Sequence, residues 1–208
     1  MFSEHVQSRA ERRANTRARV LAAAEQLFRD TGFDATTIRD IAALAQVSTG
    51  TVMAVGDKES LLVTVYDEWI SAVHRERQSD LIDDASPLSA ADAPHAILSL
   101  FTPFVEHFAR DPGLSRAYAA IIVSGRVESQ IFKQLRHALV TEIEAALVRA
   151  GLVHECAERG AYVIYFGYLG LLMSAGADDS GSAAASDFEH FLNIINFVTT
   201  SPNQGELS

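Results

Sequence analysis

The chain has 208 residues, which is enough for one large domain or for a small domain joined to a larger one. Its hydrophobic fraction of 48% beside 21% charged residues is typical of a soluble globular protein and excludes a largely disordered chain. The single cysteine, Cys156, excludes an intrachain disulfide and a zinc site built from cysteines. The N-terminus is polar throughout and no apolar run reaches the ~18 residues of a membrane span, so we expect a cytoplasmic protein that does not enter the membrane.

The net charge of −10 is unevenly distributed along the chain. Residues 1–60 carry eight Lys and Arg and eight Asp and Glu, so the whole acidic excess falls on residues 61–208. The N-terminal part also contains a basic cluster, interrupted only by Glu11, which consists of Arg9, Arg12, Arg13, Arg17 and Arg19. Such a cluster predicts contact with a polyanion, and the same composition is also compatible with a solvated tail.

The apolar spacing is helical nearly throughout, so we predict an all-α fold. The first helix is expected over residues 16–31, with Asn15 as its N-cap and Gly32 just past its end. A second helix is expected to begin at Thr37, because Thr37 and Asp40 match the two halves of a capping box.

Ser48 is expected to cap a third, short helix that ends near Ala54. A break at Gly56 then separates this helix from a long fourth helix, which opens at Lys58 and reaches about Ser79. We therefore predict an N-terminal arm and three-helix head over residues 1–57, joined through the fourth helix to a helical body over residues 58–208.

The body is expected to consist of further helices separated by polar segments. Residues 80–94 and 176–186 are interpreted as a loop and a flexible linker because they are rich in Asp, Pro, Gly and Ser. The helices are predicted over residues 95–109, 114–124, 129–150, 156–175 and 187–199.

Two short helices joined by a tight turn, behind a longer supporting helix, are the elements of a helix-turn-helix. The geometry alone also occurs as ordinary packing in all-α proteins. The residues that fill it are VLAAAEQLF (20–28), GF (32–33), TTIRDIA (36–42), AQVSTGTV (45–52) and DKESLL (57–62). In this order and spacing they closely resemble the N-terminal signature of the TetR family of bacterial transcriptional regulators. The resemblance covers about residues 16–62, and the rest of the chain matches only in its helical layout.

The resemblance implies a homodimer that binds a double-stranded DNA operator and responds to a small-molecule effector, usually as a repressor. Thr37 can then offer a hydroxyl and backbone amides to a phosphate, Gly50 lets the backbone approach DNA, and Lys58 can pair with a phosphate. The positions expected to face DNA are Arg13, Arg17, Thr37, Ser48, Thr49, Gly50, Thr51, Met53 and Lys58.

One segment departs from the family pattern. The family commonly places an aromatic residue, usually Tyr, directly after the position of Val52, and a second aromatic before the fourth helix. Here the sequence has Met53 and is one residue shorter than the family pattern up to Gly56. Met53 leaves only apolar contact, so either the preferred DNA site differs, or affinity depends more on the arginines and Lys58, or DNA binding has been lost.

In the body, aromatic residues at helical spacing are candidates for an effector pocket, and an apolar pocket suits a lipophilic molecule. These candidates are Trp69, Phe101, Phe104, Phe108, Tyr118 and Tyr165. The last two helices are apolar over most of their circumference, which predicts a dimer interface. Its candidate residues are Tyr162, Phe166, Leu169, Phe188, Phe191 and Ile195. The alternative for both sets is ordinary core packing.

We expect no catalytic residues, no metal and no cofactor. The seven histidines are scattered, and the sequence contains no HExxH, phosphate loop, GxGxxG or serine elbow. Two alternatives to a DNA-binding regulator remain: a protein of the same fold that has lost DNA contact, and a small all-α enzyme, which would need perturbed acids or bases in a cavity.

Overall fold

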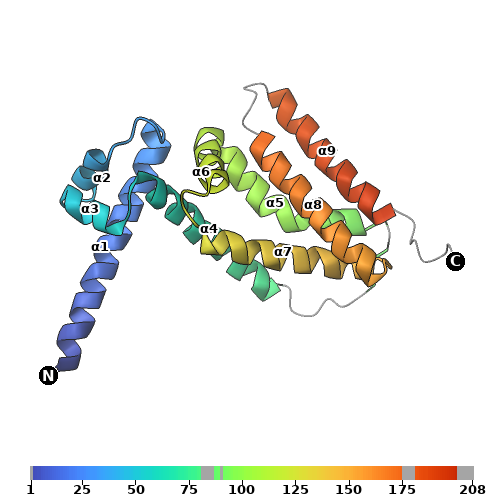
Figure 1. The fold of residues 1–208 in the computed structure, drawn as a ribbon, viewed down its shortest axis with the longest axis horizontal. Coiled ribbons are helices and arrows are strands. Elements are labelled where there is room, and N and C mark those ends of the chain that lie inside the picture. The colour runs from blue at the N-terminus through green and yellow to red at the C-terminus, as the bar shows by residue number, and fades with distance from the viewer. Residues whose placement is uncertain (1, 81–86, 90, 175–180, 201–208) are drawn as a thin grey trace. The chain divides into compact units, whose positions relative to one another are not determined.

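The computed structural model describes residues 2–80, 87–89, 91–174 and 181–200, and Figure 1 labels its helices. Within these residues the chain forms nine α-helices and no strand, which confirms the all-α prediction. They divide into two compact units, one of Met1–Trp69 with Gly113–Ser129 and one of Ile70–Pro112 with Gln130–Ser208. None of the described helices is both long and apolar enough to cross a membrane.

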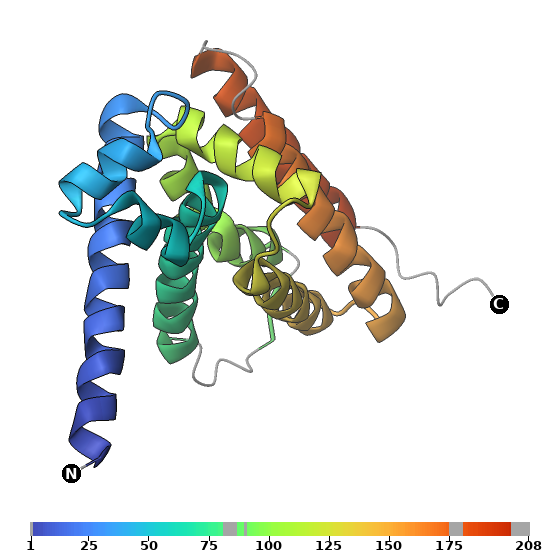
Figure 2. The same cartoon turned by 60° about the vertical axis from the view of Figure 1, so that its left-hand side comes forward.

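The first unit begins with α1 (Phe2–Thr31), whose N-terminal half extends past α2 (Ile38–Leu44) and α3 (Thr49–Val55) (Figure 2). This helix is longer than expected, because Asn15 lies inside it and does not cap it. The preceding residues include several Ala, Arg, Glu and Gln and contain no Gly or Pro, so nothing in the sequence stops the helix there.

The second half of α1 supplies the core of the head. Its buried side chains are 5% exposed or less and pack with those of α2 and α3, which α1 contacts. The core of the head consists of Val20, Leu21, Ala23, Ala24 and Phe28 of α1, Ile41 and Ala42 of α2, and Val52 of α3. Gly32 has the positive φ of 85° that ends α1, as expected for a glycine at this position.

Both predicted caps are present in the helix-turn-helix. Thr37 and Asp40 form the full capping box of α2, and the Ser48 side chain accepts a hydrogen bond from the backbone of Thr51 at the start of α3. The turn between the two helices places Gln46 at a φ of 52°, in the left-handed region.

The first unit also contains the start of α4 (Lys58–Asp80) and most of α6 (Pro112–Ser124). The Tyr66 ring of α4 stacks on the Tyr118 ring of α6 at 4.4 Å, and the Tyr66 hydroxyl lies 3.1 Å from the Ser115 hydroxyl. An ion pair between Arg126 and Glu59 adds a further attachment. These contacts explain why the first unit extends beyond the predicted head of residues 1–57.

The second unit contains α5 (Ala93–Arg110), α7 (Gln130–Arg149), α8 (His154–Ser174) and α9 (Gly181–Thr200). Helix α8 packs against both α7 and α9, and α5 contacts all three (Figure 1). Helix α9 begins six residues before the predicted start at residue 187, so the second half of the predicted linker is helical. Residues 81–86, 90 and 176–180 of the two predicted loops lie outside the described part of the chain.

Glycines allow α8 to approach its neighbours closely. A Cβ atom added at Gly160 would lie 2.6 Å from Cγ1 of Val198 and 3.1 Å from Cδ1 of Leu147. At Gly167 the nearest atom would be Cδ1 of Ile194, at 3.1 Å. The close approach of α8 to α7 and α9 at these glycines therefore occurs within the protomer.

Candidate nucleic-acid interface

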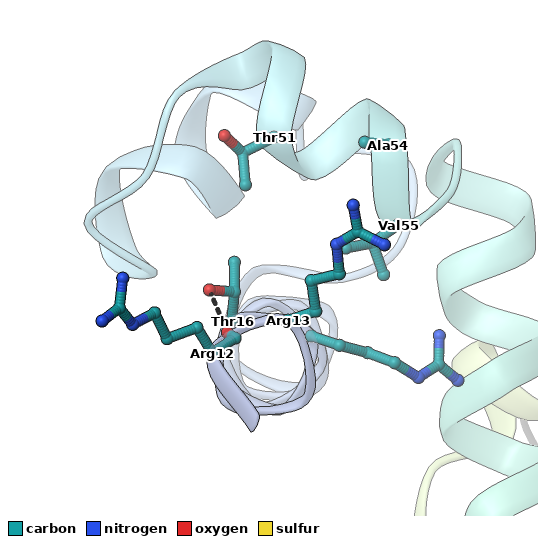
Figure 3. A pocket seen from close by; sticks show the side chains of 7 residues that line it. Arg12, Arg13, Thr16, Thr51, Ala54 and Val55 are labelled. Atoms are coloured by element: carbon teal, nitrogen blue, oxygen red, sulfur yellow. Dashed lines mark hydrogen bonds between the residues drawn. The ribbon is translucent and has the colours of Figure 1, made fainter. Parts of the chain in front are cut away.

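The N-terminal half of α1 and helix α3 form the two walls of an open groove of about 620 Å³ (Figure 3). In Figure 3 the Arg13 side chain extends toward Ala54 and Val55, while Arg12 extends from α1 in a different direction. The groove is lined by Arg12, Arg13, Thr16 and Arg17 of α1 and by Thr51, Ala54 and Val55 of α3. Three arginines of α1 thus line the groove, and the side chain of Arg13 is one that extends toward α3.

The basic residues of the head differ in how far their charge is already compensated. Arg29 pairs with Glu25 at 2.8 Å, and Arg17 lies 3.6 Å from Glu68 in an exposed pair. Within the described part of the chain, Arg9, Arg12, Arg13 and Arg39 have no carboxylate partner and are exposed. A polyanion would therefore meet uncompensated positive charge mainly at these four side chains.

Arg19 is directed into the head. Its Nη2 atom donates to the carbonyl oxygens of Ala45 and Gln46, at the end of α2 and in the turn that follows. A charged donor on these two carbonyls stabilises the turn that sets α3 against α2. Arg19, part of the basic cluster in the sequence, is thus a structural residue in this geometry.

Lys58, which the sequence analysis assigned to a DNA phosphate, also makes contacts inside the head. Its Nζ donates to the carbonyl oxygen of Phe33 at 2.9 Å and to that of Asp34 at 3.3 Å. The same ammonium group lies 4.4 Å from the centre of the Phe33 ring, within cation–π distance. These three contacts tie the start of α4 to the connection between α1 and α2.

Thr37 likewise has a structural partner where the sequence analysis expected a phosphate. Its hydroxyl donates to Asp40 Oδ2 at 2.6 Å, and its backbone amide donates to the same oxygen at 3.0 Å. These two bonds, the side-chain one first, lower the pKa of the Asp40 carboxyl from its ordinary value. The charged carboxylate therefore lies at the start of α2, where it opposes a second anion.

The exposed face of α3 carries small and apolar side chains. Thr49, Gly50 and Ala54 are exposed, and Met53 is 53% exposed. Two other hydroxyls at the front of the helix are engaged, because Ser48 Oγ lies 2.8 Å from Thr51 Oγ1 and accepts from the Thr51 amide at 3.1 Å. Of the predicted DNA-facing residues of α3, Thr49, Gly50 and Met53 lie on the surface and Thr51 lines the groove.

The segment after α3 that is shorter than the family pattern forms an ordered connection. Helix α3 ends at Val55, and a Cβ atom at Gly56 would lie only 3.1 Å from Cβ of Ser60. Asp57 Oδ1 accepts from the Ser60 amide at 2.8 Å, and this backbone bond is the main cause that lowers the pKa of the Asp57 carboxyl. Gly56 allows its backbone to approach Ser60 closely, so that only Gly56 and Asp57 separate α3 from α4.

The candidate effector residues are distributed over both units. Phe101, Phe104, Phe108 and Tyr165 belong to the second unit, and Trp69 and Tyr118 belong to the first. Five of the six are 9% exposed or less, the exception being the half-buried Trp69. Burial raises the pKa of Tyr165 to about 12, against the smaller opposing effect of Arg136.

The candidate dimer residues fall into two groups. Tyr162 and Phe166 of α8 are 45% and 60% exposed, one turn apart, with ring centroids 6.4 Å apart. Phe191 and Ile195 of α9 are only 1% and 0% exposed.

The assignment of Phe191 and Ile195 to a dimer surface therefore needs correction, because α9 turns them into its own protomer. The rings of Phe191 and Phe101 are nearly perpendicular, with their centroids 5.2 Å apart. Leu169 and Phe188 are half-buried. Phe197, which the sequence analysis did not single out, is the exposed aromatic of α9, at 71%.

No group of three or more His, Cys, Asp and Glu side chains that could hold a metal ion occurs in the residues that the structure describes.

A family model described as bacterial regulatory proteins, tetR family, matches residues 20–63. The match confirms the resemblance and runs from the second half of α1 through the helix-turn-helix to the start of α4. No curated protein and no solved structure matches the chain.

Proposed function

We propose that the chain is a repressor of the TetR type that binds a specific operator, on the premise that residues 20–63 match the model of that regulator family. The observation that carries the proposal is the groove beside α3, into which α1 brings Arg12, Arg13 and Arg17. Arginines at this place can contact phosphates on the strand that flanks α3, while the exposed face of α3 meets base edges in the major groove.

Selection of bound duplexes from a random pool tests this proposal. We expect a short pseudo-palindromic consensus with half-sites one helical turn apart, about 34–36 Å. A fluorescence-anisotropy titration of the selected duplex should then show affinity that falls steeply with salt. A pool that yields no consensus, and binding that does not depend on salt, would contradict the proposal.

We further propose that the chain forms a homodimer through the exposed aromatic surface of α8 and α9. Tyr162, Val163 and Phe166 on α8 and Phe197 on α9 are 45% to 71% exposed, and the two helices pack side by side. Apolar side chains grouped in this way are typical of a surface that a partner covers, and a pseudo-palindromic operator needs a two-fold symmetric protein.

Phe166→Glu tests this surface, because it would bury a carboxylate without a partner at the interface and costs little on a free surface. We expect light scattering to show a dimer for the wild type and a monomer for the variant at micromolar concentration. Val148→Glu is the matched control, since Val148 is 43% exposed on α7. A wild-type monomer, or a Phe166→Glu dimer as stable as the control, would contradict the proposed interface.

Release from the operator by a small lipophilic effector completes the proposal. Its support is the aromatic character of the second unit, in which Phe101, Phe104 and Phe108 share one face of α5. Trp69 is the only tryptophan, so its fluorescence can report binding during a compound screen. We expect compounds that raise the melting temperature to weaken operator binding, and compounds that bind without affecting the operator would contradict effector release.

A protein of the same fold without DNA contact is the second candidate. Two observations favour it: Met53 stands where the family has an aromatic residue, and the Lys58 ammonium contacts backbone carbonyls of the head. The selection experiment separates the two candidates, because this one predicts that no duplex is enriched.

A further inference from the structure

We propose that α3 recognises its half-site through thymine methyl groups, with Met53 and Thr49 making the contacts. The inference rests on the proposed function and names the chemistry of the DNA that the same site prefers. Its basis is the chemical composition of the exposed face of α3. Polar groups nearby, such as the Ser48 and Thr51 hydroxyls and the Lys58 ammonium, are already hydrogen-bonded within the head.

Helix α3 has the sequence TGTVMAV and carries no amide, guanidinium, ammonium or carboxylate side chain. In the major groove, guanine is read mainly by Arg or Lys, adenine by Asn or Gln, and cytosine by Asp or Glu. None of these partners is available on α3. The thymine C5-methyl is the base-edge group that apolar side chains and the Thr methyl contact.

Ala54 lines the groove beside α1, so Met53 and Thr49 are the exposed side chains of α3 outside that groove that can make such a contact. Met53 is 53% exposed, and its unbranched thioether chain adapts to an irregular apolar surface. Thr49 is exposed and offers a methyl group beside its hydroxyl, whereas the hydroxyls of Ser48 and Thr51 are hydrogen-bonded to each other.

Gly50 permits the close approach that a methyl contact needs. A Cβ atom added there would have Ser48 Oγ at 3.8 Å as its nearest neighbour, so the packing of the head itself does not require glycine. A side chain at this exposed position would instead hold the backbone of α3 away from the base edges.

The uncompensated arginines supply affinity that is independent of base sequence. Arg12 and Arg13 extend from α1 beside the groove, and Arg39 is exposed on α2. Arginines on the helices that flank α3 are suited to phosphates, which fix the register of the protein without carrying sequence information. Base readout then falls to α3.

Single replacement of each thymine in the selected operator by deoxyuridine, which lacks only the C5-methyl group, tests the inference. Burial of one methyl-sized group corresponds to about a fourfold change in affinity, so we expect a loss of roughly this size at the contacted positions. Met53→Ala should weaken binding to the thymine operator and abolish the effect of deoxyuridine at the position that Met53 contacts.

Val123→Ala is the matched control, since Val123 is 63% exposed on α6 and should leave the deoxyuridine effect unchanged. Melting temperatures of both variants should equal that of the wild type, because both side chains are largely exposed.

Three outcomes would overturn the inference. The first is a selected operator whose affinity is unchanged by deoxyuridine and falls with 7-deazaguanine, which would show arginine readout of guanine. The second is a selected operator insensitive to both, which would show that DNA shape carries the specificity. The third is the absence of any consensus, which would also overturn the proposed function, whereas the first two leave it intact.

Discussion

Replacement of both Arg12 and Arg13 by Ala should reduce the salt dependence of DNA binding while leaving the fold intact. Both side chains are exposed and without a carboxylate partner in the described part of the chain, so their loss removes no intramolecular contact of the guanidinium groups. Alanine is the best helix former, so α1 is retained. The change therefore acts on the contacts with the polyanion.

The magnitude follows from counterion release. Each phosphate contact contributes about 0.9 to the slope of log affinity against log salt, so the loss of two contacts in each protomer of the dimer, four in all, should reduce the slope by about 3.6. Over a fourfold rise, from about 50 to 200 mM, the wild-type dimer should then lose about 150-fold more affinity than the double variant.

Fluorescence anisotropy of the selected duplex at several salt concentrations measures both slopes. Arg29→Ala is the matched control, because Arg29 is on the same helix and pairs with Glu25 at 2.8 Å. Equal slopes for the double variant and the wild type would refute the assignment of these two arginines to phosphates.

Three further predictions concern the stability of the head and of the second unit. Lys58→Met should lower the free energy of unfolding by about 1–3 kcal/mol in urea titrations, because two hydrogen bonds from a charged donor are lost; a lower salt slope with unchanged stability would restore the phosphate assignment. Gly160→Ala should cost about 1–3 kcal/mol through its contact with Val198, whereas Gly170→Ala, with no atom within 4 Å of the added Cβ, should gain about 0.5–1 kcal/mol. Equal melting temperatures of the two glycine variants would contradict the packing of α8. Because the pKa of Tyr165 is raised in the folded protein, the contribution of this residue to the free energy of unfolding is fully present below the unfolded pKa of 10.0. That contribution is lost as the pH rises toward about 12. Tyr165→Phe should therefore lose less stability than the wild type between these pH values, which urea unfolding at successive pH steps measures.

Local signals in the sequence predicted the helix-turn-helix well. The capping box at Thr37, the cap at Ser48 and the glycine after α1 depend on residues within one helical turn, and all three are present as expected. The start of α1 and that of α9 were wrong for a related reason. Asn15 was interpreted as a cap although good helix formers precede it, and the Gly-Ser linker was taken as flexible although alanines fill the start of α9.

The roles of long charged side chains could not be predicted from spacing. Arg19 reaches carbonyls 26 and 27 residues further along the chain, and Lys58 reaches back 24 and 25 residues. Such partners depend on where the tertiary structure places free carbonyl groups, which the sequence pattern does not encode. The same limit applies to Phe191, whose burial depends on the packing of α9 against α5.

The length of α1 has a consequence for the helix–coil equilibrium of the free protein. Side chains from Arg9 to Asn15 are exposed, so this stretch takes little stabilisation from core packing, and short helices in water are marginally stable without it. Arg9 and Arg13 are also like charges four residues apart on this helix, which opposes helix formation. A bound phosphate chain reverses that electrostatic cost, so binding and helix ordering are thermodynamically linked. Trypsin, which cleaves unfolded chain after arginine, should therefore cut within this stretch in the free protein and be slowed there when operator DNA is bound.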